Sequence, residues 1–393
     1  MHLQNYTLIS KIKNNLNIYK NTVKKPARGA LKKDYLVPSG RYSEQWDWDA
    51  FFIGVALANE IPSEAIYLKN WALNYIFNSE NDGKVAGCII PAGNDPRLNQ
   101  MKPFLAQGIY LSSNFLNDWE WIGKYWEKIK NIVLYRERNM WNDTYGLGYW
   151  HDMMESGADN NPAGYNDIKD VVLAVDLNTF LYREYIALML IAEKLFKEKD
   201  VLFFRKRAET LRKNILKHLW NTENSILYNL DSRTGKQIKV VSYSCFIGLW
   251  ADILDKTQAD ATIQKYLLNK EEMLAKYGIR TLSKKHPQYN NENIIKPHSN
   301  WQGPIWIISN YLYIRGLMNY GYQKEAIKIA KNITNLLCED IEKTGEMHEN
   351  YNADTGEALA APGFVSWNLL ANNMLEDVLS KKDPFQLIRS SFV

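Results

Sequence analysis

The amino-acid sequence predicts an all-α fold made of paired helices. Apolar residues recur three and four positions apart through most of the 393 residues, which is the pattern of a helix with one buried face, whereas the strict alternation of a half-buried strand is almost absent. Many of the expected helices are joined by only a few residues, and such hairpins stack against one another. About twelve helices fit the chain, which is what six concentric hairpins closed into a toroid require.

The expected helices begin at residue 46 and continue almost to the end of the chain. Their apolar periodicity predicts main helices at 46–59, 62–78, 112–139, 176–198, 200–219, 240–255, 258–268, 303–320, 322–342 and 365–380, and shorter ones at 99–110 and 271–277. Short links at 60–63, 199–200 and 319–322 join neighbours into hairpins. Pro304 suits the first turn of its helix, where the missing N–H does no harm.

The chain is expected to hold one catalytic domain over residues 40–393, preceded by a basic extension over residues 1–39 that packs on the domain or leads into it. No linker rich in Pro, Gly or Ser divides the sequence, and no repeat of fixed period is visible. The longest irregular stretches are 79–98, 140–175, 278–302 and 343–364. In a helical toroid the long loops gather at one end and build the site, because loops carry polar backbone that helices do not expose.

Composition excludes several classes of function. Hydrophobic residues make up 46% and charged residues 23% of the chain, and no apolar run of about eighteen residues is present to cross a bilayer. The basic N-terminal stretch lacks the apolar segment of a secretory signal, so we expect a cytoplasmic protein without a membrane partner. A net charge of +4, with a basic run free of interleaved aromatics, argues against nucleic acid.

Cysteine usage and motif content predict no cofactor. Three scattered cysteines suggest neither a disulfide framework nor a thiolate site, and no metal-binding, phosphate-binding or dinucleotide-binding motif occurs in the sequence. The number of copies that assemble stays open, a homo-oligomer included. The aromatic content is more informative, because the faces and polar edges of 13 Trp and 24 Tyr suit the C–H faces and hydroxyl groups of sugars. Large helical cores also use many aromatics.

Two loops far apart in the sequence each place a carboxylate among Gly, Asn and aromatic residues. Residues 154–160 contain Asp159, and residues 347–356 contain Glu349. Breaking a glycosidic bond takes one carboxylic acid to protonate the leaving oxygen and a second carboxylate to activate water or attack the anomeric carbon. Taken singly, Asp159 is better read as a helix cap and Glu349 as a solvated loop residue, because most acidic residues of a chain have no chemical role. Glu346 is the nearest rival of Glu349.

Two further segments combine polar and aromatic residues where an expected helix begins, whereas a core helix would be aliphatic. Their residues are Tyr42, Trp46, Trp48 and Asp49 in the first segment, and Asn300, Trp301, Gln302 and Trp306 in the second. Trp301 and Trp306 are as consistent with a packed core as with a sugar site.

Together these segments resemble the glycoside hydrolases of family 63 and the related trehalases. Residues 46–52 are similar to the family's Trp-Asp segment, residues 155–159 to its Glu-Ser-Gly-x-Asp motif, and residues 176–178 to the Asp-Leu-Asn stretch that follows. Residues 301–306 resemble the Trp-Arg-Gly-Pro-Ile-Trp motif, and residues 349–356 the Glu-x-Tyr…Thr-Gly loop. The segments stand in the family's order and cover nearly the whole chain.

The resemblance implies an (α/α)6 barrel and an inverting α-glycosidase in which Asp159 is the catalytic acid and Glu349 the base. We expect a small α-linked glycoside as substrate, with exo action from a pocket that releases glucose or mannose. Candidate substrates are glucosylglycerate, mannosylglycerate and a disaccharide such as trehalose. The residues expected at the sugar are Tyr42, Trp46, Trp48, Asp49, Gln107, Trp301, Gln302 and Trp306.

Several roles stay open at this stage. Glu155 either raises the pKa of Asp159 through its negative charge or makes a structural hydrogen bond. Arg183 or Arg280 is the candidate partner for a carboxylate on the leaving group, with a surface role as the alternative for each. Gln302 and Asn300 stand where the family usually has Arg and Tyr, which bears on the choice of substrate.

Two other classes of function remain as alternatives. A sugar epimerase or isomerase would move a proton with a pair of histidines, for which the candidates in loops are His151, His286, His298 and His348. A glycan-binding toroid without activity would keep the aromatic pocket alone, although the presence of both Asp159 and Glu349 argues against it.

Overall fold

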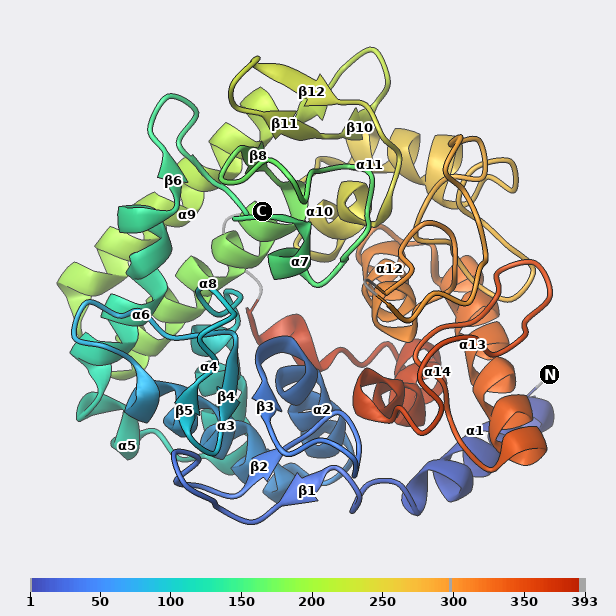
Figure 1. Ribbon diagram of the computed structural model, residues 1–393, viewed down its shortest axis with the longest axis horizontal. Coiled ribbons are helices and arrows are strands. Elements are labelled where there is room, and N and C mark those ends of the chain that lie inside the picture. Colours follow the sequence, from blue (N-terminus) through green and yellow to red (C-terminus); the bar gives the residue numbers. More distant parts are fainter. Residues whose placement is uncertain (1, 297–298, 389–393) are drawn as a thin grey trace. The chain divides into compact units, whose positions relative to one another are not determined.

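The computed structural model describes residues 2–296 and 299–388, which are mostly helical (Figure 1). The chain forms two compact units. Unit 1 comprises Met1–Ile18, Tyr149–Asp176 and Ile215–Asp383, and unit 2 comprises Tyr19–Gly148, Leu177–Asn214 and Pro384–Val393. The division into an extension over 1–39 and a catalytic domain over 40–393 stays a prediction.

The helices of unit 2 pack around an aromatic core. Its α-helices are α2 (Asp47–Glu60), α3 (Ala65–Asn78), α4 (Leu105–Leu116), α5 (Glu120–Gly123), α6 (Trp126–Asn139) and most of α8 (Val175–Lys194) and α9 (Glu198–His218). Helix α2 is buried on every side, because it carries apolar residues all around, and it packs against α3 and α4. Gly108 lets α4 approach α3, since a Cβ there would lie 2.5 Å from the ring of Trp71.

Unit 1 is built around the long helix α13 and the helices packed against it. Helix α13 (Gln323–Thr344) packs against α12 (Ile307–Asn319) and α14 (Ala371–Ser380), and its apolar face is buried while the opposite face carries Lys and Glu. Helix α1 (His2–Asn17) lies against α13 and α14 (Figure 1). The unit also contains α7 (Met153–Ser156), α10 (Ile247–Trp250), α11 (Lys256–Thr262) and a π-helical turn (Ile263–Leu267).

Short antiparallel strands support the loops of both units. In unit 2 they are β1 (Lys24–Lys25), β2 (Tyr35–Leu36), β3 (Gln45–Trp46), β4 (Cys88–Ile90), β5 (Gly93–Asn94), β6 (Trp141–Asn142) and β7 (Leu147–Gly148). In unit 1 they are β8 (Val172–Leu173), β9 (Trp220–Asn221), β10 (Ile226–Leu227), β11 (Asn229–Asp231) and β12 (Lys236–Ile238). Sequence periodicity does not find strands of two or three residues, because alternation needs about four residues to register.

Several predicted helix boundaries are wrong. The helix expected at 112–139 is broken, because Asn117 adopts a left-handed conformation (φ 49°) that ends α4. The stretch 240–255 holds only a 3-10 turn (Tyr243–Phe246) and α10, and 271–277 is not helical. Helix α1 was not predicted at all, because few of its residues are apolar and its buried face is formed by Asn5, Ile12 and Leu16. Across the described residues, every helix is too short or too polar to cross a bilayer.

Candidate active site

The loop that carries Asp159 begins with the short helix α7. Asp152 caps this helix by accepting the N–H of Glu155 at 2.8 Å, and the helix ends at Gly157, which is left-handed with φ 81°. The half-buried Asp159 follows two residues later, where its Oδ2 accepts the backbone N–H of Ser299 at 3.1 Å. This hydrogen bond fixes one carboxyl oxygen and ties the loop to a second segment of unit 1.

That second segment, residues 299–306, forms a platform to which the loop of Asp159 is bonded. The N–H of Trp301 donates to Asn160 Oδ1 at 2.6 Å, and Gln302 Nε2 donates to the carbonyl oxygen of Asn160 at 3.0 Å. Asn300 Oδ1 in turn accepts the N–H of Gln302 at 2.9 Å. Of the two residues that depart from the family pattern, Gln302 therefore binds the backbone next to Asp159, and Asn300 holds Gln302 in place.

The loop that carries Glu349 is a β-hairpin paired with the same platform. The N–H of Glu349 donates to the carbonyl of Ala360 at 2.9 Å, which closes the hairpin. Tyr351 and Ile305 exchange both backbone hydrogen bonds, at 2.7 and 3.0 Å. Both candidate carboxylates of unit 1 are thus mounted on residues 299–306, one near each end of the platform.

Asp340 of α13 binds the other side of the hairpin. Its Oδ2 accepts the hydroxyl of Tyr351 at 2.8 Å and lies 2.9 Å from Nδ1 of His348. Burial raises the pKa of Tyr351 well above its ordinary value, so its hydroxyl stays protonated and donates. Sequence reasoning missed Asp340, although an acid on the buried face of an amphipathic helix is a signal that it has a polar partner.

The structure separates Glu349 from its rival Glu346 by their attachments. Glu346 follows Gly345, which ends α13, and its N–H donates to the hydroxyl of Thr344 at 3.2 Å. Glu349, in contrast, lies in the hairpin that pairs with the platform. Glu155 accepts the N–H of His151 at 2.6 Å, and its electrostatic effect on Asp159 stays a prediction. The choice of Glu349 as base stays a prediction.

Two of the tryptophans expected at the sugar are buried in the core of unit 1. Trp301 is 0% and Trp306 1% exposed, and their rings stack on each other with centroids 4.2 Å apart. Trp306 Nε1 also donates to the carbonyl of Asn300 at 2.8 Å. Each ring therefore covers one face of the other, and both rings pack in the core beneath the platform.

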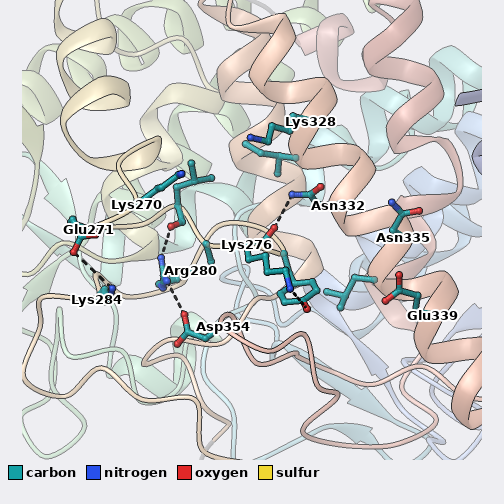
Figure 2. Close-up of a pocket in the computed structure, with 15 residues that line it drawn as sticks. Lys270, Glu271, Lys276, Arg280, Lys284, Lys328, Asn332, Asn335, Glu339 and Asp354 are labelled. Carbon is teal, nitrogen blue, oxygen red and sulfur yellow. Dashed lines mark hydrogen bonds and ion pairs between the residues drawn. The ribbon is translucent and has the colours of Figure 1, made fainter. Parts of the chain in front are cut away.

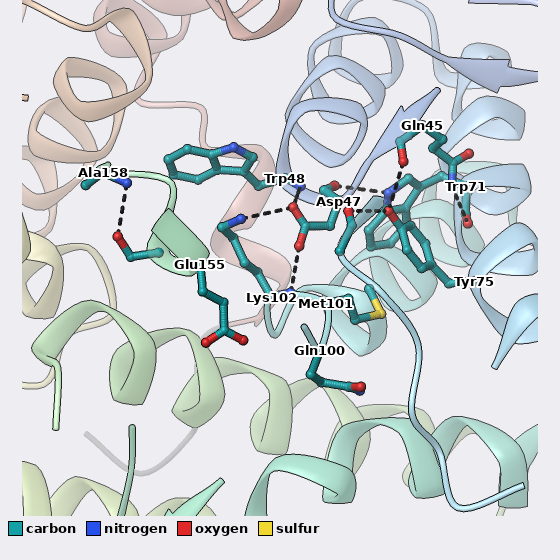
Figure 3. A network of polar contacts seen from close by, with 12 residues as sticks. Gln45, Asp47, Trp48, Trp71, Tyr75, Gln100, Met101, Lys102, Glu155 and Ala158 are labelled. Carbon is teal, nitrogen blue, oxygen red and sulfur yellow. Dashed lines mark hydrogen bonds and ion pairs between the residues drawn. The ribbon is translucent and has the colours of Figure 1, made fainter. Parts of the chain in front are cut away.

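In unit 2, Asp47 organises the segment that carries Trp46 and Trp48 (Figure 3). Its buried carboxylate accepts the N–H of Trp48 at 2.7 Å and the N–H of Lys102 at 2.8 Å, and it pairs with the Lys102 ammonium at 3.3 Å. That ammonium also lies 5.1 Å from the ring centroid of Trp48. The sequence placed Asp47 in the Trp-Asp segment but gave a role only to the neighbouring Asp49, and it did not single out Lys102.

The remaining sugar-site candidates of unit 2 differ in exposure. Tyr42 and Trp46 are half-buried, whereas Trp48 is 5% and Asp49 6% exposed. Their contacts with a sugar stay predictions.

Gln107 and Arg183 lie together inside unit 2. Arg183 Nε donates to Gln107 Oε1 at 3.1 Å, and Gln107 Nε2 donates to the carbonyl of Pro103 at 2.8 Å. Gln107 is fully buried and Arg183 is 3% exposed. Because protein groups bind these side chains on both sides, the structure gives them a structural role, and their contacts with a ligand stay predictions.

The neighbouring Glu184 is a buried acid whose protonation should make the stability of the protein depend on pH. Burial raises the pKa of the Glu184 carboxyl to about 8, while its Oε2 accepts the N–H of Ala106 at 2.8 Å. Between the ordinary pKa of about 4.3 and about 8, the folded state binds more protons than the unfolded chain. The free energy of unfolding should therefore fall as pH rises through this window.

Replacing Glu184 with Gln, which keeps the shape of the protonated acid, should remove this contribution. We expect urea unfolding at about pH 5 and about pH 8 to show a smaller loss of stability for the variant than for the unchanged protein. An equal loss in both proteins would contradict a neutral, buried Glu184.

A cavity of about 750 Å³ in unit 1 lies between α13 and residues 270–284 (Figure 2). Arg280 lines it and is held by Asp354 Oδ1 at 2.8 Å and by the Tyr289 hydroxyl at 3.0 Å. The residues that line it include neither Asp159 nor Glu349. If Arg280 binds a carboxylate of the substrate, it has to do so while it is also paired with Asp354.

The histidines of the alternative function lie in different surroundings. His151 Nδ1 contacts Asp170 at 2.9 Å, and His348 contacts Asp340 as described above. Burial lowers the pKa of His286, and His298 lies outside the described residues. Within residues 2–296 and 299–388, no group of three or more His, Cys, Asp or Glu is arranged to hold a metal ion.

Comparison with known proteins identifies a family model and several relatives. The model of the mannosylglycerate hydrolase MGH1-like glycoside hydrolase domain matches residues 42–367. The cytosolic neutral trehalase of Kluyveromyces lactis is 20% identical over 82% of this chain and 51% of that protein. The mannosylglycerate hydrolase of Rubrobacter radiotolerans is 25% identical over 53% of this chain and 45% of that protein. The chain thus matches about half the length of these curated relatives.

Among solved structures, the chain resembles the GH63 mannosylglycerate hydrolase of Thermus thermophilus. In its complex with glucose the TM-score is 0.69 at 18% identity, covering 92% of this chain and 98% of that one. In its complex with Tris and D-glycerate the TM-score is 0.70 at 17% identity, covering 94% and 100%. At this identity the likeness is one of fold.

Proposed function

Because the chain belongs to the family of mannosylglycerate hydrolase MGH1-like glycoside hydrolase domains, we propose that it is an inverting, exo-acting α-glycosidase. The membership confirms the resemblance to glycoside hydrolase family 63 that the sequence motifs indicated. The mostly helical (α/α)6 fold class and the assignment to glycoside hydrolases are confirmed with it. The mechanism, the substrate and the catalytic residues are the content of the proposal.

In the proposed mechanism, Asp159 and Glu349 divide the two proton transfers of the reaction. Asp159 donates a proton to the glycosidic oxygen as the bond to the anomeric carbon breaks. Glu349 removes a proton from a water molecule that attacks the anomeric carbon from the opposite face, so the configuration inverts. Inverting enzymes hold the two carboxyl groups about 6.5–9.5 Å apart, because the water must fit between base and sugar.

The observation that carries this assignment is the shared platform. Residues 299–306 bind the residue after Asp159 through Trp301, and they bind the hairpin of Glu349 through Ile305. One segment of unit 1 therefore holds both loops. Catalysis needs such a fixed geometry, because a displacement of about 1 Å costs about a hundredfold in rate.

The proposed substrate is a small α-linked glycoside, with mannosylglycerate, glucosylglycerate and trehalose as the candidates. Relatives named as mannosylglycerate hydrolases and a neutral trehalase support this range. The Thermus enzyme was solved with glucose and with D-glycerate, which match the two halves of such a substrate. We expect a cytoplasmic enzyme that releases one monosaccharide per cleavage.

The test is hydrolysis of a panel of purified glycosides: mannosylglycerate, glucosylglycerate, trehalose, kojibiose and nigerose. We expect one of the two glycerates to have the highest kcat/KM, and proton NMR to show the β-anomer as the first product, since an inverting enzyme converts an α-linkage into a β-hemiacetal. A first-formed α-anomer would contradict inversion. Interconversion of free sugars without hydrolysis would favour the epimerase alternative, and binding without turnover would favour the glycan-binding toroid.

A further inference from the structure

We propose that Asp340 is the positioning residue of the catalytic base, and that it sets the orientation of Glu349 by holding His348 and Tyr351, the residues on either side of the Glu349–Asn350 pair. The inference rests on the proposed function, because it presumes that Glu349 is the base. Asp340 lies on α13, outside every sequence segment that resembles the family. It touches the hairpin of Glu349 and takes no part itself in proton transfer to the substrate.

The geometry is a closed ring of hydrogen bonds around residues 348–351. Asp340 Oδ2 accepts the Tyr351 hydroxyl at 2.8 Å and lies 2.9 Å from His348 Nδ1. The Tyr351 hydroxyl accepts the backbone N–H of His348 at 3.1 Å. His348 precedes and Tyr351 follows the Glu349–Asn350 pair. Both residues contact Asp340 Oδ2, and they are also bonded to each other.

Burial makes this ring strong. The side chain of Asp340 is 4% exposed and that of His348 is 12% exposed, and Tyr351 is fully buried. Hydrogen bonds to a carboxylate are stronger than those between neutral groups. Among the described groups around the carboxylate, the Thr344 hydroxyl also faces Asp340 Oδ1 at 3.2 Å, so three polar side chains engage it.

The ring complements the platform on the opposite side of Tyr351. Backbone bonds to Ile305 fix Tyr351 from one side, and Asn291 and Arg280 hold the turn of the hairpin at Ala353 and Asp354. The side chain of Tyr351 adds an attachment to α13, and Asn368 Nδ2 donates to the carbonyl of His348 at 2.9 Å. Glu349 is therefore fixed relative to a long helix as well as to the platform.

The expected signature is a loss of kcat without a matching change in KM. Asp340→Ala should lower kcat about a hundredfold, in line with the cost of about 1 Å of misplacement, while KM stays within about threefold. Tyr351→Phe should lower kcat about tenfold. His348→Ala should also lower it about tenfold, whereas His348→Asn, whose amide N–H replaces Nδ1–H, should recover most of the loss.

The matched control is Tyr311→Phe. Tyr311 is a buried tyrosine of unit 1 on α12, and its hydroxyl accepts from Arg315 at 3.1 Å instead of binding the hairpin. We expect it to lower the melting temperature about as much as Tyr351→Phe and to leave kcat within about twofold. Circular dichroism confirms that each variant is folded at the assay temperature, and the histidine pair decides the question should Asp340→Ala fail to fold.

Glu349→Gln separates the failure of this inference from that of the proposed function. An active Glu349→Gln variant would overturn the proposed function, and the positioning role with it. An inactive Glu349→Gln variant alongside near-normal kcat for Asp340→Ala and Tyr351→Phe would overturn the positioning role alone. Equal losses in Tyr351→Phe and Tyr311→Phe, or in His348→Asn and His348→Ala, would also overturn it, because they would indicate general damage to unit 1.

Discussion

Replacing Asp159 with Asn should lower the turnover of natural glycosides by about 10²–10⁴-fold, the range that a general acid contributes. Asn has no proton to give to the leaving oxygen, but it keeps the size of the side chain and can still accept from the N–H of Ser299. Substrates with very good leaving groups, such as glycosyl fluorides, need little protonation. Their hydrolysis by Asp159→Asn should therefore be reduced far less, and a fluoride-release assay measures the difference.

Asp170→Asn is the control for the acid. Asp170 lies in the same long loop and pairs with His151 at 2.9 Å, so the substitution makes the same chemical change without touching the platform. We expect it to leave both activities within about twofold. Equal losses on glycosides and fluorides for Asp159→Asn would indicate a structural role for Asp159 and would remove it from the mechanism.

Replacing Glu349 with Gln should suppress both kinds of substrate, by about 10²–10⁴-fold. Every substrate of an inverting enzyme needs an activated water, whatever its leaving group, and Gln does not accept the proton. The selectivity between glycoside and fluoride should stay close to that of the unchanged enzyme, which is the opposite of the result expected for Asp159→Asn. Steady-state rates on the same pair of substrates measure both effects.

Glu346→Gln is the matched control for the base, because it makes the same change three residues away, at the end of α13 rather than in the hairpin. We expect its kcat to stay within about threefold. A larger loss in Glu346→Gln than in a folded, active Glu349→Gln would transfer the role of base to Glu346.

Long periodic helices were predictable from the sequence, and short elements were not. The helices at 62–78 and 322–342 were found within a few residues, because their apolar faces repeat over several turns. The break at Asn117 was missed, since a left-handed conformation at one residue leaves no trace in the periodicity. Helix α1 was missed for the related reason that its buried face is narrow and includes the polar Asn5.

The segments of the candidate site were predictable from the sequence, and the contacts among them were not. Motifs identified the loops of Asp159 and Glu349 because carboxylates, Gly and aromatics are concentrated there. The same composition left Trp301 and Trp306 as consistent with a packed core as with a sugar site, and in the structure they stack on each other in the core. Asp340 carries no motif, because its role depends on which side of α13 meets the hairpin, and sequence spacing does not reveal that contact.

The length of the platform also sets the distance between the loops of Asp159 and Glu349. Its contact with Asn160 is at Trp301 and its contact with the hairpin is at Ile305, and four residue steps span at most about 14 Å. Inserting one residue between them would shift one loop against the other by about 3.5 Å, a large part of the roughly 6.5–9.5 Å that an inverting pair requires. A substitution such as the Gln at position 302, where the family usually has Arg, leaves this spacing unchanged. Insertions and deletions between residues 301 and 305 should therefore be far more damaging than substitutions in the same stretch.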